Sequence, residues 1–180
     1  MTVTAPGYST AAKAQHWTMA ALIFGLLCVG TVMVFLPKGG LRGDMIDLHK
    51  QVGVAVLALA ALRLGWRLTR GAPALPATMA ARERLIAHAG HLGLYVLMFA
   101  MPLTGIVMSQ AGGHPVTLLG LTLPPLVGND HGLHELAEGG HEVLAWAIGL
   151  LAVAHAAAAL RHHYVLKDDI LRRMLPKRGG

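Results

Sequence analysis

Residues 141–163, HEVLAWAIGLLAVAHAAAALRHH, decide the expected fold of this chain. From His141 to Leu160 the only charged side chain is that of Glu142, and about 20 mostly apolar residues suffice for a helix to cross a bilayer. His141 and His155 interrupt the apolar run, and ionisable side chains inside a membrane are costly and usually functional. The stretch therefore predicts a transmembrane helix that carries two functional imidazoles.

Three further apolar stretches, at about residues 14–36, 48–68 and 85–108, are also long enough to cross a membrane. A helix-breaking linker, residues 71–76, follows the second stretch, and a glycine- and proline-rich loop, about 111–139, precedes the fourth at 141–163. Charged residues make up 13% of the 180 residues, against about 25% in soluble domains. We expect an all-α membrane protein, a four-transmembrane-helix bundle formed by one domain, residues 1–180.

The charged residues indicate how the helices are oriented. Most basic residues fall on one side of the expected bundle: Lys13, Arg63, Arg67, Arg70, Arg82, Arg84, Arg161, Lys167, Arg172, Arg173, Lys177 and Arg178. The other side has Lys38, Arg42 and Lys50 together with Asp44, Asp47, Asp130, Glu135, Glu138 and Glu142. Because basic loops stay in the cytoplasm, both termini are expected there, in a bacterial inner membrane.

Two other interpretations of the composition are less favoured. The net charge of +6 could suggest nucleic-acid binding, but 54% of the residues are hydrophobic, and basic loops at a membrane surface explain the charge better. The first apolar stretch could be a signal peptide, but it lacks a convincing cleavage site and carries His16. We therefore expect no nucleic-acid partner and a first stretch that stays as a span.

The spacing of the histidines predicts two sites at different depths. His141 and His155 are 14 residues apart, which in an α-helix places them within about 40° of one face and about 21 Å apart along the axis. If the first helix begins near Thr10, a residue suited to an N-cap, His16 lies near the cytoplasmic end. If the second begins near Asp44, His49 lies near the periplasmic end. We expect His16 to pair with His155, and His49 with His141.

Two paired imidazoles are suitable axial ligands for haem iron, and the interior of a helical bundle is a usual place for such cofactors. The chain has no CxxCH sequence, so the haems should be b-type, held without covalent links. Each histidine could instead form a hydrogen bond across the bundle. A zinc or copper site is a further alternative, but it usually gathers three or four ligands in one place.

His88 and His91, near the start of the third stretch, lie at a depth within reach of His16. Either could take an axial position, although the fourth stretch already supplies both depths; hydrogen bonding to a haem propionate or a quinone is their milder role. Arg63, Arg67 and Arg84 are interpreted as positive-inside anchors, with propionate binding as the alternative.

The remaining histidines and the tryptophans have milder interpretations. His114, His131 and His134 are expected in solvent in the periplasmic loop, with a peripheral metal site as the minor alternative. The tryptophans are expected to anchor the helices at the membrane interface, and Trp17, next to His16, could also flank a cofactor or a quinone.

The chain resembles the bacterial cytochrome b561 family of di-haem membrane proteins, and within it the superoxide oxidase type. The resemblance covers nearly the whole chain. Its motifs are residues 15–17 (QHW), 47–49 (DLH), 87–93 (AHAGHLG), 101–105 (MPLTG), 141–142 (HE), 155–160 (HAAAAL), 162–164 (HHY), 167–168 (KD) and 173–176 (RMLP). The periplasmic loop with His114, His131 and His134 departs from the family's pattern.

The resemblance implies two haem b groups with axial ligands at His16, His49, His141 and His155. It also implies that superoxide is oxidised to oxygen and that ubiquinone accepts the electron, with His162 at the quinone. From its place next to His16, Trp17 is expected at the quinone as well. We further expect Lys38, Arg42 and Lys50 to steer superoxide toward the periplasmic haem. One alternative is a haem subunit that passes electrons from a partner dehydrogenase or hydrogenase to quinone. Another is a non-enzymatic transporter or structural bundle.

Overall fold

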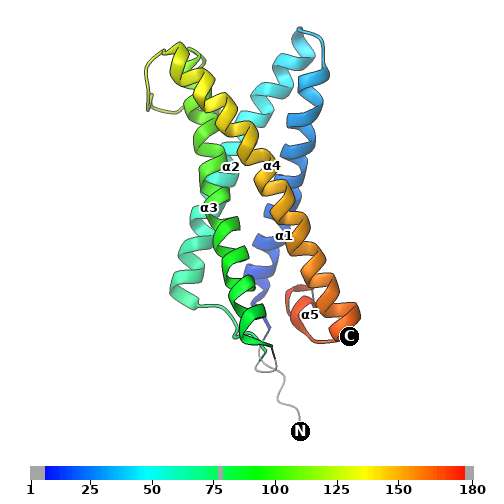
Figure 1. Ribbon diagram of the computed structural model, residues 1–180. Coiled ribbons are helices and arrows are strands. Elements are labelled where there is room, and N and C mark those ends of the chain that lie inside the picture. The colour runs from blue at the N-terminus through cyan, green and yellow to red at the C-terminus, as the bar shows by residue number, and fades with distance from the viewer. Residues whose placement is uncertain (1–6, 77–78, 177–180) are drawn as a thin grey trace.

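The computed structural model describes residues 7–76 and 79–176, so Lys177 and Arg178 lie outside the described residues. Four long helices lie side by side (Figure 1), and each is long and apolar enough to cross a membrane. They are α1 (Thr10–Phe35), α2 (Gly40–Arg70), α3 (Ala81–Ala111) and α4 (His131–Arg161). The shorter elements are β1 (Thr117–Leu118), β2 (Leu121–Thr122), a π-helical turn η1 (His162–Leu166) and α5 (Ile170–Met174).

Local side-chain and backbone contacts explain where the long helices begin and end. The Ser9 hydroxyl accepts a hydrogen bond from the backbone N–H of Ala12 at 3.2 Å, so Ser9, and not Thr10, is the N-cap of α1. The helix α2 begins at Gly40, before Asp44, and ends at Arg70; its C-cap is Gly71, whose φ of 70° favours glycine.

Helix α4 begins at His131, well before the expected span. The Asp130 carboxylate accepts a hydrogen bond from the Leu133 N–H at 2.9 Å and caps the helix, which explains the early start. His131 and His134 therefore lie in the first turns of α4, and their expected place in a loop was wrong. The first turns contain more polar residues than the apolar stretch that follows, as a helix extended beyond a bilayer would.

The packed centre of the bundle receives one residue from each long helix. Met19, Ala60, Met98 and Ile148 form this central layer, and all four are buried. Many large apolar side chains point outward instead; Phe24 on α1 is 71% exposed and Leu150 on α4 is 68% exposed. Such a surface suits a lipid environment, because lipid tails solvate apolar side chains as well as a protein interior does.

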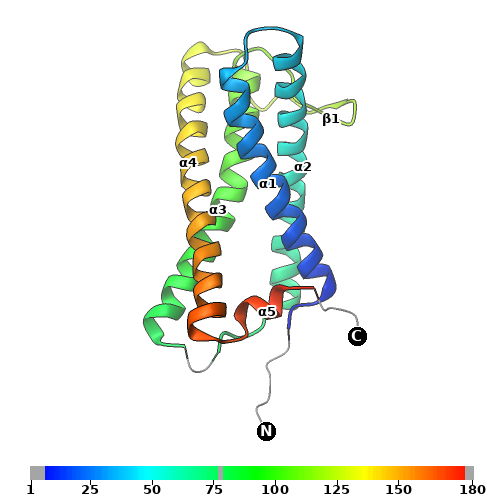
Figure 2. The same cartoon turned by 90° about the vertical axis from the view of Figure 1, so that its right-hand side faces the viewer.

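Both ends of the described chain lie at the same end of the bundle, where α1 begins and α5 ends (Figure 2). The basic residues of the α2 terminus and of α5 gather at this end, which is therefore the end that the positive-inside rule predicts to face the cytoplasm. We call it the cytoplasmic end and the opposite one the outer end. An ion pair of 3.2 Å between Arg161 and Glu83 joins α4 to α3 at the cytoplasmic end.

Between α3 and α4, the chain forms a small antiparallel hairpin at the outer end. In it Thr117 pairs with Thr122 and Leu118 with Leu121. The hairpin projects sideways from the bundle (Figure 2), while Val116, just before it, is 1% exposed. The long loop expected from the sequence is thus shorter than predicted and partly ordered as strands.

Candidate functional site

At the outer end, His49 of α2 and His141 of α4 face each other. Their ring centroids are 6.3 Å apart, with 70° between the ring planes. Each ring lies against a glycine of a neighbouring helix: a Cβ added to Gly30 would lie 3.3 Å from His49 Cε1, and one added to Gly105 would lie 3.1 Å from His141 Cε1. Both distances are shorter than ordinary van der Waals contact, so the two glycines make room for the imidazoles.

The outer pair borders a cavity of about 370 Å³, which is within the usual size range of ligand pockets. Both histidines line it, and apolar residues such as Val54 and Ile106 form much of the wall. His49 Nδ1 is buried, and within residues 7–76 and 79–176 it has no hydrogen-bond partner. The His141 Nδ1 lies 3.2 Å from the Thr104 hydroxyl oxygen, which can fix the ring's orientation.

At the cytoplasmic end, His16 of α1 lies opposite His155 of α4. Their ring centroids are also 6.3 Å apart, with 64° between the planes. The ring of His91 on α3 lies closer still to His155, at 5.4 Å. A guanidinium nitrogen of Arg63 lies 3.4 Å from His16 Nδ1. Three imidazoles therefore meet at this end, whereas His88 is exposed.

Both histidine pairs are suitable for a shared metal centre. Two imidazoles on opposite sides of one metal ion each place a nitrogen at about 2 Å from it. The distance between the two ring centroids is then the sum of the two metal–nitrogen bonds and, for each ring, the distance from that nitrogen to the centroid. The 6.3 Å separations fit this arrangement. In the described ranges, 7–76 and 79–176, no three His, Cys, Asp or Glu side chains form a group that could hold a bare metal ion. The donor sets therefore fit haem iron better than zinc or copper.

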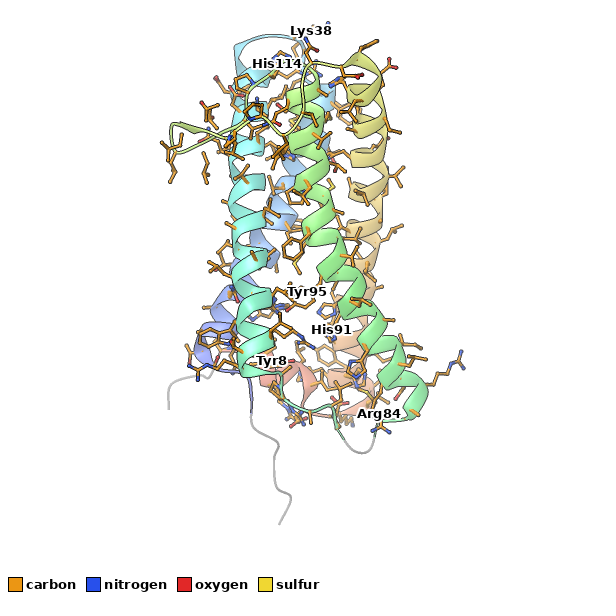
Figure 3. The ribbon with its side chains drawn as sticks, turned by 90° about the vertical axis from the view of Figure 1, so that its left-hand side faces the viewer. Tyr8, Lys38, Arg84, His91, Tyr95 and His114 are labelled. Atoms are coloured by element: carbon orange, nitrogen blue, oxygen red, sulfur yellow. The ribbon has the colours of Figure 1, made fainter. Side chains whose placement is uncertain are left out.

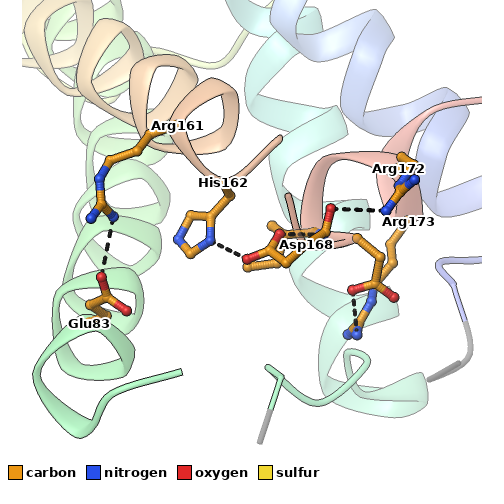
Figure 4. Close-up of polar contacts among 8 residues, drawn as sticks. Glu83, Arg161, His162, Asp168, Arg172 and Arg173 are labelled. Atoms are coloured by element: carbon orange, nitrogen blue, oxygen red, sulfur yellow. Dashed lines mark hydrogen bonds and ion pairs between the residues drawn. The ribbon is translucent and has the colours of Figure 1, made fainter. Parts of the chain in front are cut away.

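Trp17 and His162, the residues expected at a quinone, both contact the C-terminal segment. The Trp17 indole N–H donates to the carbonyl of Met174 at 3.0 Å. The His162 Nδ1 and a carboxylate oxygen of Asp168 form a short hydrogen bond (Figure 4). His162 opens the π-helical turn η1, whose C-cap Lys167 has a left-handed conformation with φ 56°. Such turns are frequent at functional sites.

A second cavity, of about 390 Å³, lies at the cytoplasmic end between the start of α1 and the end of α2. Arg63, Arg67 and Arg70 line it together with Trp66 and Tyr95. The Arg67 guanidinium lies 5.8 Å from the centroid of the Tyr95 ring, which Figure 3 shows between the helices. Sequence reasoning missed this cavity, although arginines at positions i, i+4 and i+7 of one helix already indicated a cationic face.

The three residues expected to steer superoxide have different surroundings. Lys38 is exposed in the loop between α1 and α2 (Figure 3). Arg42 is half-buried, and among the described residues its Nε has no hydrogen-bond partner. Lys50 forms an ion pair of 2.8 Å with Asp47. Lys38 is therefore the most accessible of the three positive charges.

The histidines expected in the outer loop also differ from one another. His114 is exposed and His131 forms an ion pair with Glu135 at 3.3 Å. His134 is half-buried, and its Nδ1 lies 2.8 Å from the carbonyl oxygen of Met108, so its expected exposure to solvent was wrong. His114 and His134 both line the outer cavity.

Comparisons with known proteins identify relatives of this chain. The family model described as "Prokaryotic cytochrome b561" matches residues 7–177. The chain is 35% identical over 172 residues to "Cytochrome b561 homolog 2" of Escherichia coli, covering 94% of this chain and 92% of that protein. It is 30% identical over 173 residues to "Probable superoxide oxidase CybB" of Yersinia pestis, covering 96% and 98%. It is also 32% identical over 180 residues to "Cytochrome b562" of Cereibacter sphaeroides, covering 96% and 98%.

The matches cover all four long helices and both histidine pairs. They agree with the family expected from the sequence motifs. The chain belongs to the prokaryotic cytochrome b561 family, and is thus a multi-pass bacterial membrane haem protein that transfers electrons.

Proposed function

We propose that this protein is a single-domain, di-haem b cytochrome of the inner membrane that oxidises superoxide and reduces ubiquinone. The observation that carries the proposal is the presence of two histidine pairs, each with ring centroids 6.3 Å apart, at opposite ends of the bundle. The choice of superoxide is supported by the 30% identity to the relative named a probable superoxide oxidase. In the overall reaction, two superoxide anions become two oxygen molecules. Their two electrons, together with two protons taken up from water, convert one ubiquinone to ubiquinol.

The protein's part is to hold two haems at two depths. His49 and His141 would hold the outer haem, and His16 and His155 the cytoplasmic one. When bound, haem b supplies one-electron redox chemistry, and its surroundings tune the potential. Because α4 carries one ligand of each pair 14 residues apart, a single straight element of about 21 Å sets the separation of the two sites.

At the cytoplasmic end, His162 would bind the quinone. Its Nδ1 is bonded to Asp168, so Nε2 is the ring nitrogen that can reach a quinone carbonyl and deliver a proton. Trp17 would form an apolar wall, because its N–H is already bonded to the Met174 carbonyl. The C-terminal segment of η1 and α5 would thus position both residues.

His162→Ala is expected to raise the KM for a short-chain ubiquinone by about two- to tenfold, the equivalent of one net hydrogen bond. Asp168→Asn should raise the KM less, because it weakens the hydrogen bond that orients the His162 ring but leaves the ring in place. Steady-state quinone reduction measures both variants. His131→Ala, an exposed histidine at the opposite end, is the matched control. An unchanged KM in His162→Ala would exclude His162 from quinone binding.

Neutralising Lys38, Arg42 and Lys50 with glutamine is expected to lower kcat/KM for superoxide by roughly tenfold at low ionic strength, near the lower limit of electrostatic steering. The difference should nearly vanish at 1 M salt, where the Debye length is about 3 Å. The control neutralises three exposed basic residues of the cytoplasmic half, Arg82, Arg84 and Lys167. Equal rates for both triple variants at low salt would contradict the steering role.

The proposed activity is tested with the purified protein alone. We expect a reduced-minus-oxidised spectrum of haem b, two haems per chain, and ubiquinone reduction that depends on an enzymatic superoxide source and stops when superoxide dismutase is added. Co-purification with an iron–sulfur protein and inactivity alone would instead indicate a subunit that serves a dehydrogenase or hydrogenase. Colourless protein would indicate a transporter or structural bundle.

A further inference from the structure

The hairpin between α3 and α4 exposes leucines where a soluble loop would expose polar residues. Residues 115–128, PVTLLGLTLPPLVG, contain no charged side chain. Leu119 at the tip is 88% exposed, and Leu121 is 76% exposed. The only polar side chains in this segment are the hydroxyls of Thr117 and Thr122.

The turn of the hairpin is also unusual. Leu119 and Gly120 have φ values of 51° and 82°, so the two-residue turn has positive φ at both central positions. Asparagine or aspartate followed by glycine is preferred there, because a larger side chain is strained at positive φ. Leu119 packs against neither core cluster found within residues 7–76 and 79–176. A contact outside the protein would explain its position best.

Packing shows how deep the hairpin lies. The buried residues Val54 of α2, Ile106 of α3 and Val116 form one cluster, against which Leu118 and Leu123 of the hairpin pack. Val54 is five residues beyond His49, which at the rise of an α-helix places it about 7.5 Å further from the outer end. The hairpin therefore lies beside the membrane-spanning part of α2, below the level of Lys38 and His114 (Figure 3).

We propose that residues 116–123 insert into the outer interfacial layer of the lipid bilayer, with Leu119 and Leu121 among the upper parts of the acyl chains. The interfacial layer is favoured over the hydrocarbon centre because the open edges of a two-stranded hairpin need hydrogen-bonding partners. Within the hairpin, the Leu123 N–H already donates to the Val116 carbonyl at 2.8 Å. The proposal rests on the membrane location of the chain and is independent of the proposed function.

A lipid partner fits the hairpin better than a second copy of this chain. Stable protein interfaces bury about 800 Å² on each partner, whereas the exposed apolar part of the hairpin consists of two leucines at a narrow tip. Interfacial lipids need no such area or shape complementarity, because apolar side chains partition into them individually. Inserted leucines would also hold Val116 in place, where it lines the outer cavity beside His49 and His141.

Spin labels can measure the depth of the hairpin in protein reconstituted into vesicles of phosphatidylethanolamine and phosphatidylglycerol. Cys28 is the only cysteine and is first replaced by serine. Labels are then attached through Leu119→Cys or, as a second site, Leu121→Cys. Lys38→Cys gives the reference in water, and Leu150→Cys gives the reference in lipid, because Leu150 is 68% exposed on α4. Circular dichroism verifies that each labelled protein is folded.

The measured quantity is the ratio of accessibility to oxygen, which concentrates in lipid, over accessibility to a water-soluble nickel chelate. We expect the ratios at positions 119 and 121 to be shifted clearly above that at position 38 and toward that at position 150. Ratios equal to that at position 38 would overturn the proposal. So would protection from both reagents together with dipolar broadening between labels, which would place a second copy on the hairpin.

Discussion

Replacing His141 or His155 by alanine is expected to remove one haem and leave the other. Each histidine belongs to a different pair, and its ring lies 6.3 Å from that of its partner. Loss of a residue that only hydrogen-bonds to a metal ligand weakens metal binding by roughly 10–100-fold. Loss of the ligand itself should weaken haem binding by more than this. The haem content should therefore fall from two per chain to about one, and superoxide-driven quinone reduction should be abolished in both variants.

The haem content is measured by the pyridine haemochrome assay, and a redox titration shows which of two potentials is lost. The two variants should lose different potentials, because the outer and cytoplasmic sites have different charges around them. His88→Ala is the control, since His88 is an exposed histidine on α3. Retention of two haems in either variant, or loss of the same potential in both, would contradict the assignment of the pairs.

His16→Ala is expected to remove the cytoplasmic haem, whereas His91→Ala should retain it. All three imidazoles meet at this end, and the centroid of His91 is the nearer one to His155, at 5.4 Å against 6.3 Å for His16. We favour His16 because its ring centroid lies 6.3 Å from that of His155, the same separation as in the outer pair of His49 and His141. In the described ranges, no third histidine ring contacts that outer pair. A His91 ring beside the ligands is suited to orient His155 or a haem propionate.

The comparison of the two variants uses the same haem assay and low-temperature electron paramagnetic resonance of the oxidised protein. His91→Ala should shift the signal of the cytoplasmic haem without removing it, because a positioning residue changes the orientation of a ligand. Haem loss in His91→Ala together with a full haem content in His16→Ala would reverse the assignment and make His91 the axial ligand.

The sequence predicted the depth of the histidines better than their lateral contacts. Depth follows from the constant rise of a helix, so the 14-residue spacing of His141 and His155 was sufficient to expect one site at each end. Lateral distance depends on how the helices tilt and cross, and local sequence does not specify this. The proximity of His91 to His155, and the cavity beside Arg63 and Arg67, therefore became apparent only in the folded chain.

The outer loop was predicted least well. Its glycines and prolines indicated irregular structure, yet the Asp130 cap starts α4 early and brings His134 to the Met108 carbonyl. The hairpin could not be predicted from the sequence either, because Leu119–Gly120 is an uncommon sequence for a turn of its type. A tertiary contact, the packing of Val116 on α2 and α3, stabilises this hairpin where local preference does not.

The central layer of Met19, Ala60, Met98 and Ile148 has a consequence for bioenergetics. Ile148 lies seven residues from both His141 and His155, so this packed apolar layer separates the two proposed haem sites. Electrons can tunnel through packed hydrocarbon, but protons need a chain of water or polar groups to cross it. Turnover that moves electrons inward and takes protons for ubiquinol from the cytoplasm would therefore be electrogenic, and vesicles containing the protein should build up a voltage while they consume superoxide.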